Sequence, residues 1–177
     1  RSVRFGLVIA ILAALGTGAI VWYQVRHEYQ SSVEDLDRRA AALIFRSTPA
    51  AKDALSLPDA QVGAAMGDRL DGHSRLLGLA LFRPEGRLIA SGQGVTDFEP
   101  TLAPIVGLIS QAVPNSQQVV RNEAGTTHVR ATAIAGADGQ PSGVLVIVHD
   151  ALYLEDRLTR GMVRGLALAL AAAGLLF

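Results

Sequence analysis

The chain has 177 residues, of which 50% are hydrophobic and 18% are charged, and its 16 basic residues balance its 16 acidic ones. This length holds one ordinary domain together with membrane segments. The zero net charge offers no basic excess for nucleic-acid binding, and the absence of cysteine excludes disulfides, thiolate nucleophiles and cysteine-ligated metal sites.

The first element is an apolar run. The nineteen residues Phe5–Tyr23 contain no charge, and as a helix they span about 28 Å, close to the hydrocarbon thickness of a bilayer. Trp22 and Tyr23 close the run, where an interfacial aromatic belt is expected. Because the run is longer than the apolar part of a signal peptide and lacks a small-residue cleavage site, the sequence favours an uncleaved transmembrane helix. Two arginines among residues 1–4 favour a cytoplasmic N-terminus.

A long helix follows, because no helix breaker occurs between Tyr23 and Pro49. Its apolar residues step by four, three, four and three, which is the heptad seam of a coiled coil. Two interpretations stay open: residues 29–43 join two copies in a parallel dimer stem, or the seam packs on the chain's own domain. The segment Ser47–Ala51 predicts the end of this helix. The seam residues are Tyr29, Val33, Leu36, Ala40 and Leu43.

The centre of the chain predicts an α+β domain with five antiparallel strands and helices on one face. Ser56 is expected to cap a second helix that ends near Leu70, and the turn Arg83–Gly86 has proline and glycine where a type I turn favours them. The expected strands are Leu76–Phe82, Arg87–Ala90, Gln117–Arg121, Thr127–Ala135 and Gly143–His149, and a further helix covers Thr101–Val113.

The last strand leads directly into a helix. Val144–Val148 is an unbroken apolar run, mostly of β-branched residues, as a core strand requires. Asp150 is expected to cap the helix that follows, and Tyr153 lies in its first turn. Since no loop separates the two elements, we expect a shift of the strand to move the helix. Asp150 and Tyr153 are therefore assigned as the signal junction.

A second apolar run begins at Met162 within this helix. It contains a single charge, Arg164, and its uncharged remainder is too short to cross a bilayer alone. The chain also begins without methionine. We therefore expect a fragment cut at both ends, with an extracytoplasmic domain at residues 24–160 and the truncated start of a second transmembrane helix at residues 161–177.

Small residues recur every four positions in both apolar runs. This spacing lets membrane helices approach closely, so we expect helix contacts within the lipid bilayer and a homodimer. These residues are Ala10, Ala14 and Gly18 in the first run and Gly161, Gly165, Ala169 and Ala173 in the second.

Four polar residues are candidate contacts for a small-molecule ligand. His128 and Arg130 share one face of a strand and Arg83 ends another, and arginine suits a carboxylate. The alternative is that these residues lie on the solvated face of an antiparallel sheet. His149 either lines a ligand cavity or acts as a pH-dependent latch. In the alternative interpretation it is a partly buried residue beside the capping Asp150.

Catalytic and cofactor sites are not expected. The four histidines lack the spacing of a zinc site, and no pair of glycines completes a dinucleotide-binding motif. No serine lies in a G-x-S-x-G sequence. The sequence therefore predicts no catalytic residue, no metal and no cofactor.

The hairpin LALFRPEGRLIASG, Leu79–Gly92, resembles the Cache/PAS-like extracytoplasmic sensor domains of bacterial receptors and sensor kinases. The resemblance implies a periplasmic domain held in the bacterial inner membrane by two crossings, the second feeding a HAMP coiled coil and a cytoplasmic effector. A shorter stretch, VLVIVHDALYLEDR at Val144–Arg157, resembles the sensor region attached to certain bacterial trehalose-6-phosphate synthases. The leading hypothesis is a membrane-anchored sensor module, and the alternative is a non-sensing dimerisation and anchoring region of such an enzyme.

Overall fold

The computed structural model describes residues 2–72, 74–111, 115–122, 125–136 and 138–174. Within these ranges the side chains of residues 2–11, 13–14, 108–111, 115, 122, 169 and 172–173 lie outside the description. The chain forms two compact units: a helical unit made of Arg1–Glu34 and Tyr153–Phe177, and a sheet unit made of Asp35–Leu152.

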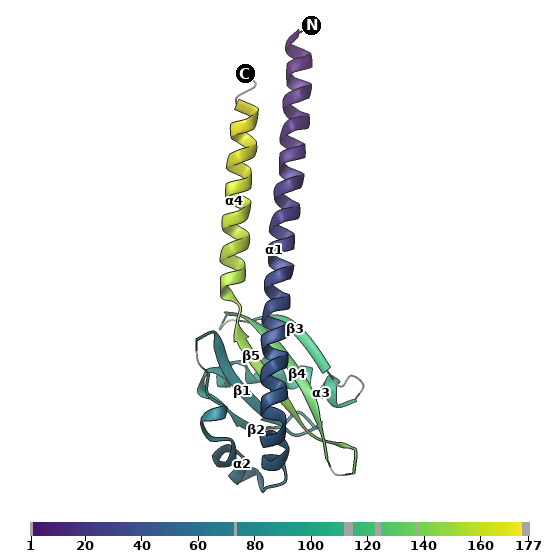
Figure 1. Cartoon of the computed structure of the whole chain (residues 1–177), viewed down its shortest axis with the longest axis vertical. Coiled ribbons are helices and arrows are strands. Elements are labelled where there is room, and N and C mark those ends of the chain that lie inside the picture. The colour runs from purple at the N-terminus through teal and green to yellow at the C-terminus, as the bar shows by residue number, and fades with distance from the viewer. Residues whose placement is uncertain (1, 73, 112–114, 123–124, 137, 175–177) are drawn as a thin grey trace. The chain divides into compact units, whose positions relative to one another are not determined.

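The order of elements agrees closely with the predicted α+β class, and Figure 1 labels them. The strands form one antiparallel sheet in the order β2-β1-β5-β4-β3, which confirms the five-stranded prediction. The helices are α1 (Ser2–Leu55), α2 (Asp59–Met66), α3 (Glu99–Gln111) and α4 (Leu152–Gly174), with 3-10 turns at Gly67–Arg69 and Gln93–Phe98. The strands are β1 (Leu76–Phe82), β2 (Leu88–Ser91), β3 (Asn115–Asn122), β4 (Gly125–Ala135) and β5 (Pro141–Asp150).

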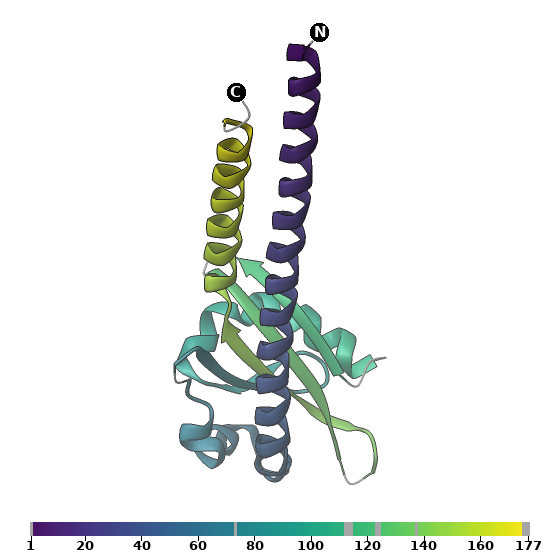
Figure 2. The same cartoon turned by 45° about the horizontal axis from the view of Figure 1, so that its top comes forward.

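Helices cover both faces of the sheet, so the prediction of helices on one face is wrong. On one face, buried residues of α1 and α2 pack with Leu145 and Ile147 of β5; Figure 2 shows the C-terminal part of α1 lying across the sheet. On the other face, α3 packs with Val144, Val146 and Val148 of the same strand. Because both faces are buried, β5 is a continuous apolar run rather than an alternating one.

The helix break predicted at Ser47–Ala51 is wrong, because α1 continues through Pro49 to Leu55. Thr48 donates its hydroxyl hydrogen to the carbonyl of Ile44 (2.7 Å) just before the proline. The turns after Pro49 bury Ala51 and Leu55 in the core of the sheet unit. This burial outweighs the hydrogen bond that proline removes.

The predicted start of α2 is also wrong, and the predicted end of α3 is untested. Ser56 does not cap α2: its hydroxyl donates to the carbonyl of Asp53 (2.6 Å), and α2 begins at Asp59, after Pro58. The predicted helix end at Val113 lies outside the described residues. The alternation predicted for β4 is confirmed, because Val129, Ala131 and Ala133 all belong to the cluster beneath α3.

Within the helical unit, α1 and α4 pack closely at two glycines. A Cβ atom built on Gly161 would lie 2.7 Å from a methyl carbon of Val25, and one on Gly165 would lie 2.2 Å from a methyl carbon of Val21. Gly161 and Gly165 therefore let α4 approach α1 closely within one chain, whereas the expected contact between copies in a bilayer stays a prediction. The side chains of Ala10, Ala14, Ala169 and Ala173 lie outside the described residues.

A search of the described part of the chain for a helix with the length and apolarity needed to cross a membrane finds none.

The sheet unit offers a direct test of packing at Gly143. A Cβ atom at this position would lie 2.7 Å from Leu55 Cδ1 and 2.8 Å from the carbonyl oxygen of Phe82. Gly143→Ala should therefore destabilise the chain by about 1–3 kcal/mol in urea unfolding, because the backbone of β1 must move.

Gly107→Ala is the matched control, since a Cβ atom on Gly107 meets no atom within 4 Å. It should stabilise α3 by about 0.5–1 kcal/mol through its better helix propensity. Equal unfolding midpoints for the two variants would contradict the packing described at the end of α1.

Candidate functional site

Two buried histidines lie opposite each other at the end of β5. The register of the β4–β5 pair places His128 directly across from His149. Their ring centroids are 6.3 Å apart, and the two residues are 0% and 4% exposed. Arg130 follows two residues along β4, so it points to the same face of the sheet. This is the face that α1 covers, so the alternative of a solvated sheet face is wrong.

Asp37 of α1 connects this group to two strands. Its carboxylate forms an ion pair with the guanidinium of Arg130, and both side chains are only 22% exposed. With its amide nitrogen turned toward α1, Gln117 of β3 donates to both carboxylate oxygens of Asp37 (2.5 and 2.8 Å). We call Asp37, Gln117, His128, Arg130 and His149 the histidine–arginine cluster.

The two imidazoles of the cluster are held in the neutral form. Burial, together with smaller contributions from His128 and Arg39, lowers the pKa of His149 to about 4. Burial also lowers the pKa of His128; Asp37 opposes this effect and Arg130 adds to it. Among the described residues, neither ring nitrogen of His128 has a hydrogen-bond partner, and Nδ1 of His149 has none. Unpaired buried polar groups reduce stability, so this pair is an unusual feature of the core.

Of the four predicted ligand contacts, the structure brings three together and separates the fourth. His128, Arg130 and His149 lie in the cluster, whereas Arg83 binds the carboxylate of Asp59 in α2 through Nε (3.1 Å) and Nη2 (2.5 Å). Hydrogen bonds from Arg83 and then Arg87 lower the pKa of Asp59. Arg83 therefore fastens α2 to the β1–β2 turn.

The sequence prediction missed Asp37, Gln117 and Asp59. The heptad pattern did not single out Asp37, because this residue lies beside the apolar seam rather than in it. One signal in the sequence was available: Asp37 directly follows the seam residue Leu36. When the seam of a helix packs on a sheet, a residue beside the seam lies at the edge of the contact. Gln117 and Asp59 had no signal in the sequence, because their partners lie on other elements.

Chemically, the cluster can exchange protons and holds no catalytic nucleophile. Arg130 already pairs with a carboxylate of its own chain, so an anionic ligand at this place would have to displace Asp37. The two neutral imidazoles are the groups in the cluster that can gain charge.

The junction after the cluster is a single residue. β5 ends at Asp150 and α4 begins at Leu152, with the buried Ala151 between them. The carboxylate of Asp150 accepts a hydrogen bond from the backbone N–H of Leu152 (2.9 Å), which confirms its predicted capping role. The backbone N–H of Ala151 donates to the carbonyl of Thr126 (2.9 Å), so β4 holds the junction in place.

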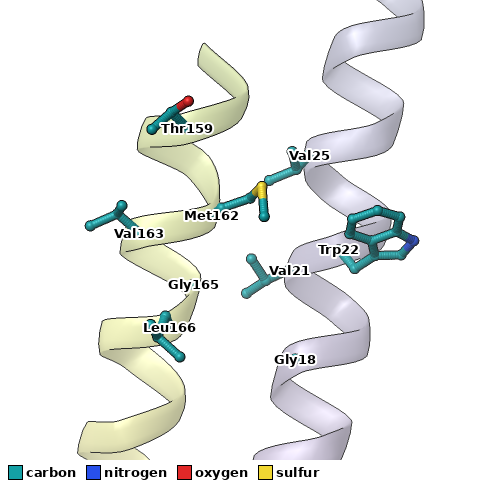
Figure 3. Close-up of a pocket in the computed structure, with 9 residues that line it drawn as sticks. All are labelled: Gly18, Val21, Trp22, Val25, Thr159, Met162, Val163, Gly165 and Leu166. Carbon is teal, nitrogen blue, oxygen red and sulfur yellow. The ribbon is translucent and has the colours of Figure 1, made fainter. Parts of the chain in front are cut away.

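Tyr153, the second junction residue, lies in the helical unit, where the guanidinium of Arg157 stacks 5.9 Å from the centroid of its ring. Further along α4 the same unit contains an apolar groove of about 590 Å³. Figure 3 shows Val21 and Met162 projecting toward the space between the two helices. The groove is lined by Gly18, Val21, Trp22, Val25, Thr159, Met162, Val163, Gly165 and Leu166.

No family model and no curated protein matches the chain. Among solved structures it is similar to the sensor domain of DcuS from E. coli, with 14% identity and a TM-score of 0.48 over 73% of this chain and 98% of that one. It is also similar to the periplasmic domain of LuxQ from Vibrio cholerae, with 16% identity and a TM-score of 0.43 over 76% of this chain and 69% of that one.

The histidine pair predicts acid-sensitive stability. The folded pKa of His149 is about 4, below the value near 6.5 of an unfolded chain, so the unfolded state binds more protons between these pH values. The free energy of unfolding should fall by roughly 3 kcal/mol as pH drops from 6.5 to 4 because of this group alone. Urea unfolding across that range measures the loss.

His149→Leu should remove most of this dependence while leaving stability at pH 7.5 unchanged or higher, because it deletes an unpaired buried nitrogen. His27→Leu, which removes an exposed imidazole, should keep the wild-type pH profile. An unchanged acid slope in His149→Leu would contradict the assignment of a buried neutral histidine.

Proposed function

We propose that the chain is the sensor module of a bacterial inner-membrane protein. In this proposal the sheet unit lies in the periplasm and passes a signal through the second transmembrane helix to a cytoplasmic effector, by way of a HAMP segment. The observation that carries the proposal is the junction: β5 is buried along its length from Gly143 to His149, and only Ala151 separates it from α4.

The membrane part of the proposal rests on the sequence. Residues 1–4 are assigned to the cytoplasm, 5–23 to the first crossing, 24–160 to the periplasm and 161–177 to the start of the second crossing. The run Phe5–Tyr23 has no charged residue, and many of its side chains lie outside the described set. Its length suits the hydrocarbon core of a bilayer.

The cue acts through the histidine–arginine cluster. A ligand or a proton can shift the sheet unit between two arrangements only by the difference in its affinity for them. His128, Arg130 and His149 are suited to this role because they link β4 and β5 to α1 directly before the junction. Protonation of His128 would place a buried positive charge beside Arg130, and protonation of His149 would place one near Arg39.

A homodimer is part of the proposal, with the part of the seam near the membrane as its stem. Ala40 is fully buried in the core cluster of the sheet unit and Leu36 is 3% exposed, so neither side chain is available to a second copy. Tyr29 and Val33 lie in the helical unit and are half-buried there. The stem would therefore use Tyr29, Val33 and the small residues of the membrane runs.

A flexible insertion tests the coupling. In the full-length protein, a Gly-Ser pair inserted after Asp150 should abolish or strongly reduce the response of the effector to its cue. The two flexible residues would absorb a displacement of β5 before it reached α4. The measurement is the effector's output with and without the cue.

The same Gly-Ser pair inserted after Gly139 is the control, since this exposed residue lies in the β4–β5 turn, at the other end of β5. It should preserve regulation. Full regulation in the protein with the insertion after Asp150 would rule out transmission through a rigid junction.

A second candidate function is a non-sensing anchor that holds two copies of a membrane enzyme, such as a trehalose-6-phosphate synthase, together. The observation favouring it is that the chain's own helices cover both faces of the sheet. A thermal-shift screen separates the two functions. A sensor should show a ligand-specific rise in melting temperature, whereas an anchor should respond to none of the compounds tested.

A further inference from the structure

A second hollow of the helical unit is lined by three arginines. It has a volume of about 340 Å³ and is formed by Glu28, Arg157, Arg160, Gly161 and Arg164. Three arginines against one glutamate give it a formal charge of +2. The arginines lie three and four residues apart, so they project from one side of α4.

The guanidinium groups of this hollow are available to a ligand. In the part of the chain that the structure describes, none of the three pairs with a carboxylate within 4 Å. Arg157 stacks on Tyr153, and Nε of Arg160 donates to the carbonyl of Asp156 (3.1 Å). Both interactions leave terminal N–H groups free, and planar guanidinium groups bind the oxygens of phosphate in pairs.

The hollow lies at the level where the unit's surface becomes apolar. The contact between Gly161 and Val25 fixes the register of the two helices at the hollow. One turn further along α4, Leu166 is 64% exposed, and Trp22 on α1 is 59% exposed. Tryptophan beside an apolar surface and basic residues is typical of the headgroup layer of a bilayer.

We propose that this hollow binds the phosphate of an anionic phospholipid headgroup. The inference rests on the membrane placement in the proposed function and is independent of signalling. The charge favours an anionic lipid over a zwitterionic one, because a choline group would bring a cation toward three arginines with a single carboxylate to compensate it. Bound lipid would then hold α4 at a fixed depth.

The test compares lipid retention by the complete chain in neutral detergent. Native mass spectrometry should show phosphatidylglycerol bound in preference to phosphatidylcholine. Arg160→Gln/Arg164→Gln should weaken binding of phosphatidylglycerol about twenty-fivefold, since each basic residue near a lipid surface contributes roughly a fivefold change. Glu28→Gln should strengthen it about fivefold by removing the opposing charge.

Arg46→Gln/Arg69→Gln removes the same charge from exposed positions of the sheet unit and should bind lipid like the unaltered chain. Equal retention of both lipids would overturn the inference. Unchanged binding of phosphatidylglycerol in the double arginine variant, or in Glu28→Gln, would also overturn it. If an equal concentration of inorganic phosphate displaced the bound lipid, the hollow would be a site for free phosphate, and the proposal of a lipid ligand would be wrong.

Detergent-phase partitioning of the same chain separates the two proposals. A chain that enters the detergent phase but shows no preference between the lipids overturns the lipid site and leaves the membrane anchor standing. A chain that stays in the aqueous phase and does not enter the detergent phase overturns both the lipid site and the membrane anchor.

Discussion

The packing of α1 against the sheet determines the rest of the sheet unit. Its apolar residues, from Ala40 to Leu55, bury one face of β1 and β5, and its Asp37 binds β3 and β4 through Gln117 and Arg130. Because α1 covers this face of the sheet, it excludes water from the histidine pair. This loss of solvation is the largest cause of the lowered pKa of both imidazoles. The unusual chemistry of the cluster therefore follows from ordinary apolar burial by a neighbouring helix.

The same packing holds β5 firmly in the sheet. A strand buried on both faces by α1 and α3, and paired on both edges by β1 and β4, cannot shift without changing several contacts together. His149 lies at its last buried position, directly before Asp150. Unpaired buried nitrogens are retained there despite their cost, and such departures from good packing concentrate at functional positions.

Local patterns predicted the strands well and the helix packing poorly. Leu76–Phe82 was predicted to the residue because an apolar run followed by a proline–glycine turn depends only on neighbours in the chain. The alternation of β4 and the cap at Asp150 were predicted for the same reason. Pro49 misled the prediction because local propensity opposed a helix that core packing maintains. Asp37 was missed because its partners Gln117 and Arg130 lie 80 and 93 residues away in the sequence, and only the folded sheet brings them together.

The helical unit has a spacing that suits movement of α4 along α1. Gly161 and Gly165 are four residues apart, and so are Val25 and Val21, which they contact. Displacing α4 by one turn, about 5.4 Å, would bring one glycine of the pair to the valine that now faces the other. One close glycine–valine contact survives a displacement in either direction, so the spacing is compatible with more than one register of α4 along α1. The junction of one residue after β5 contains too little chain to absorb a displacement of that size.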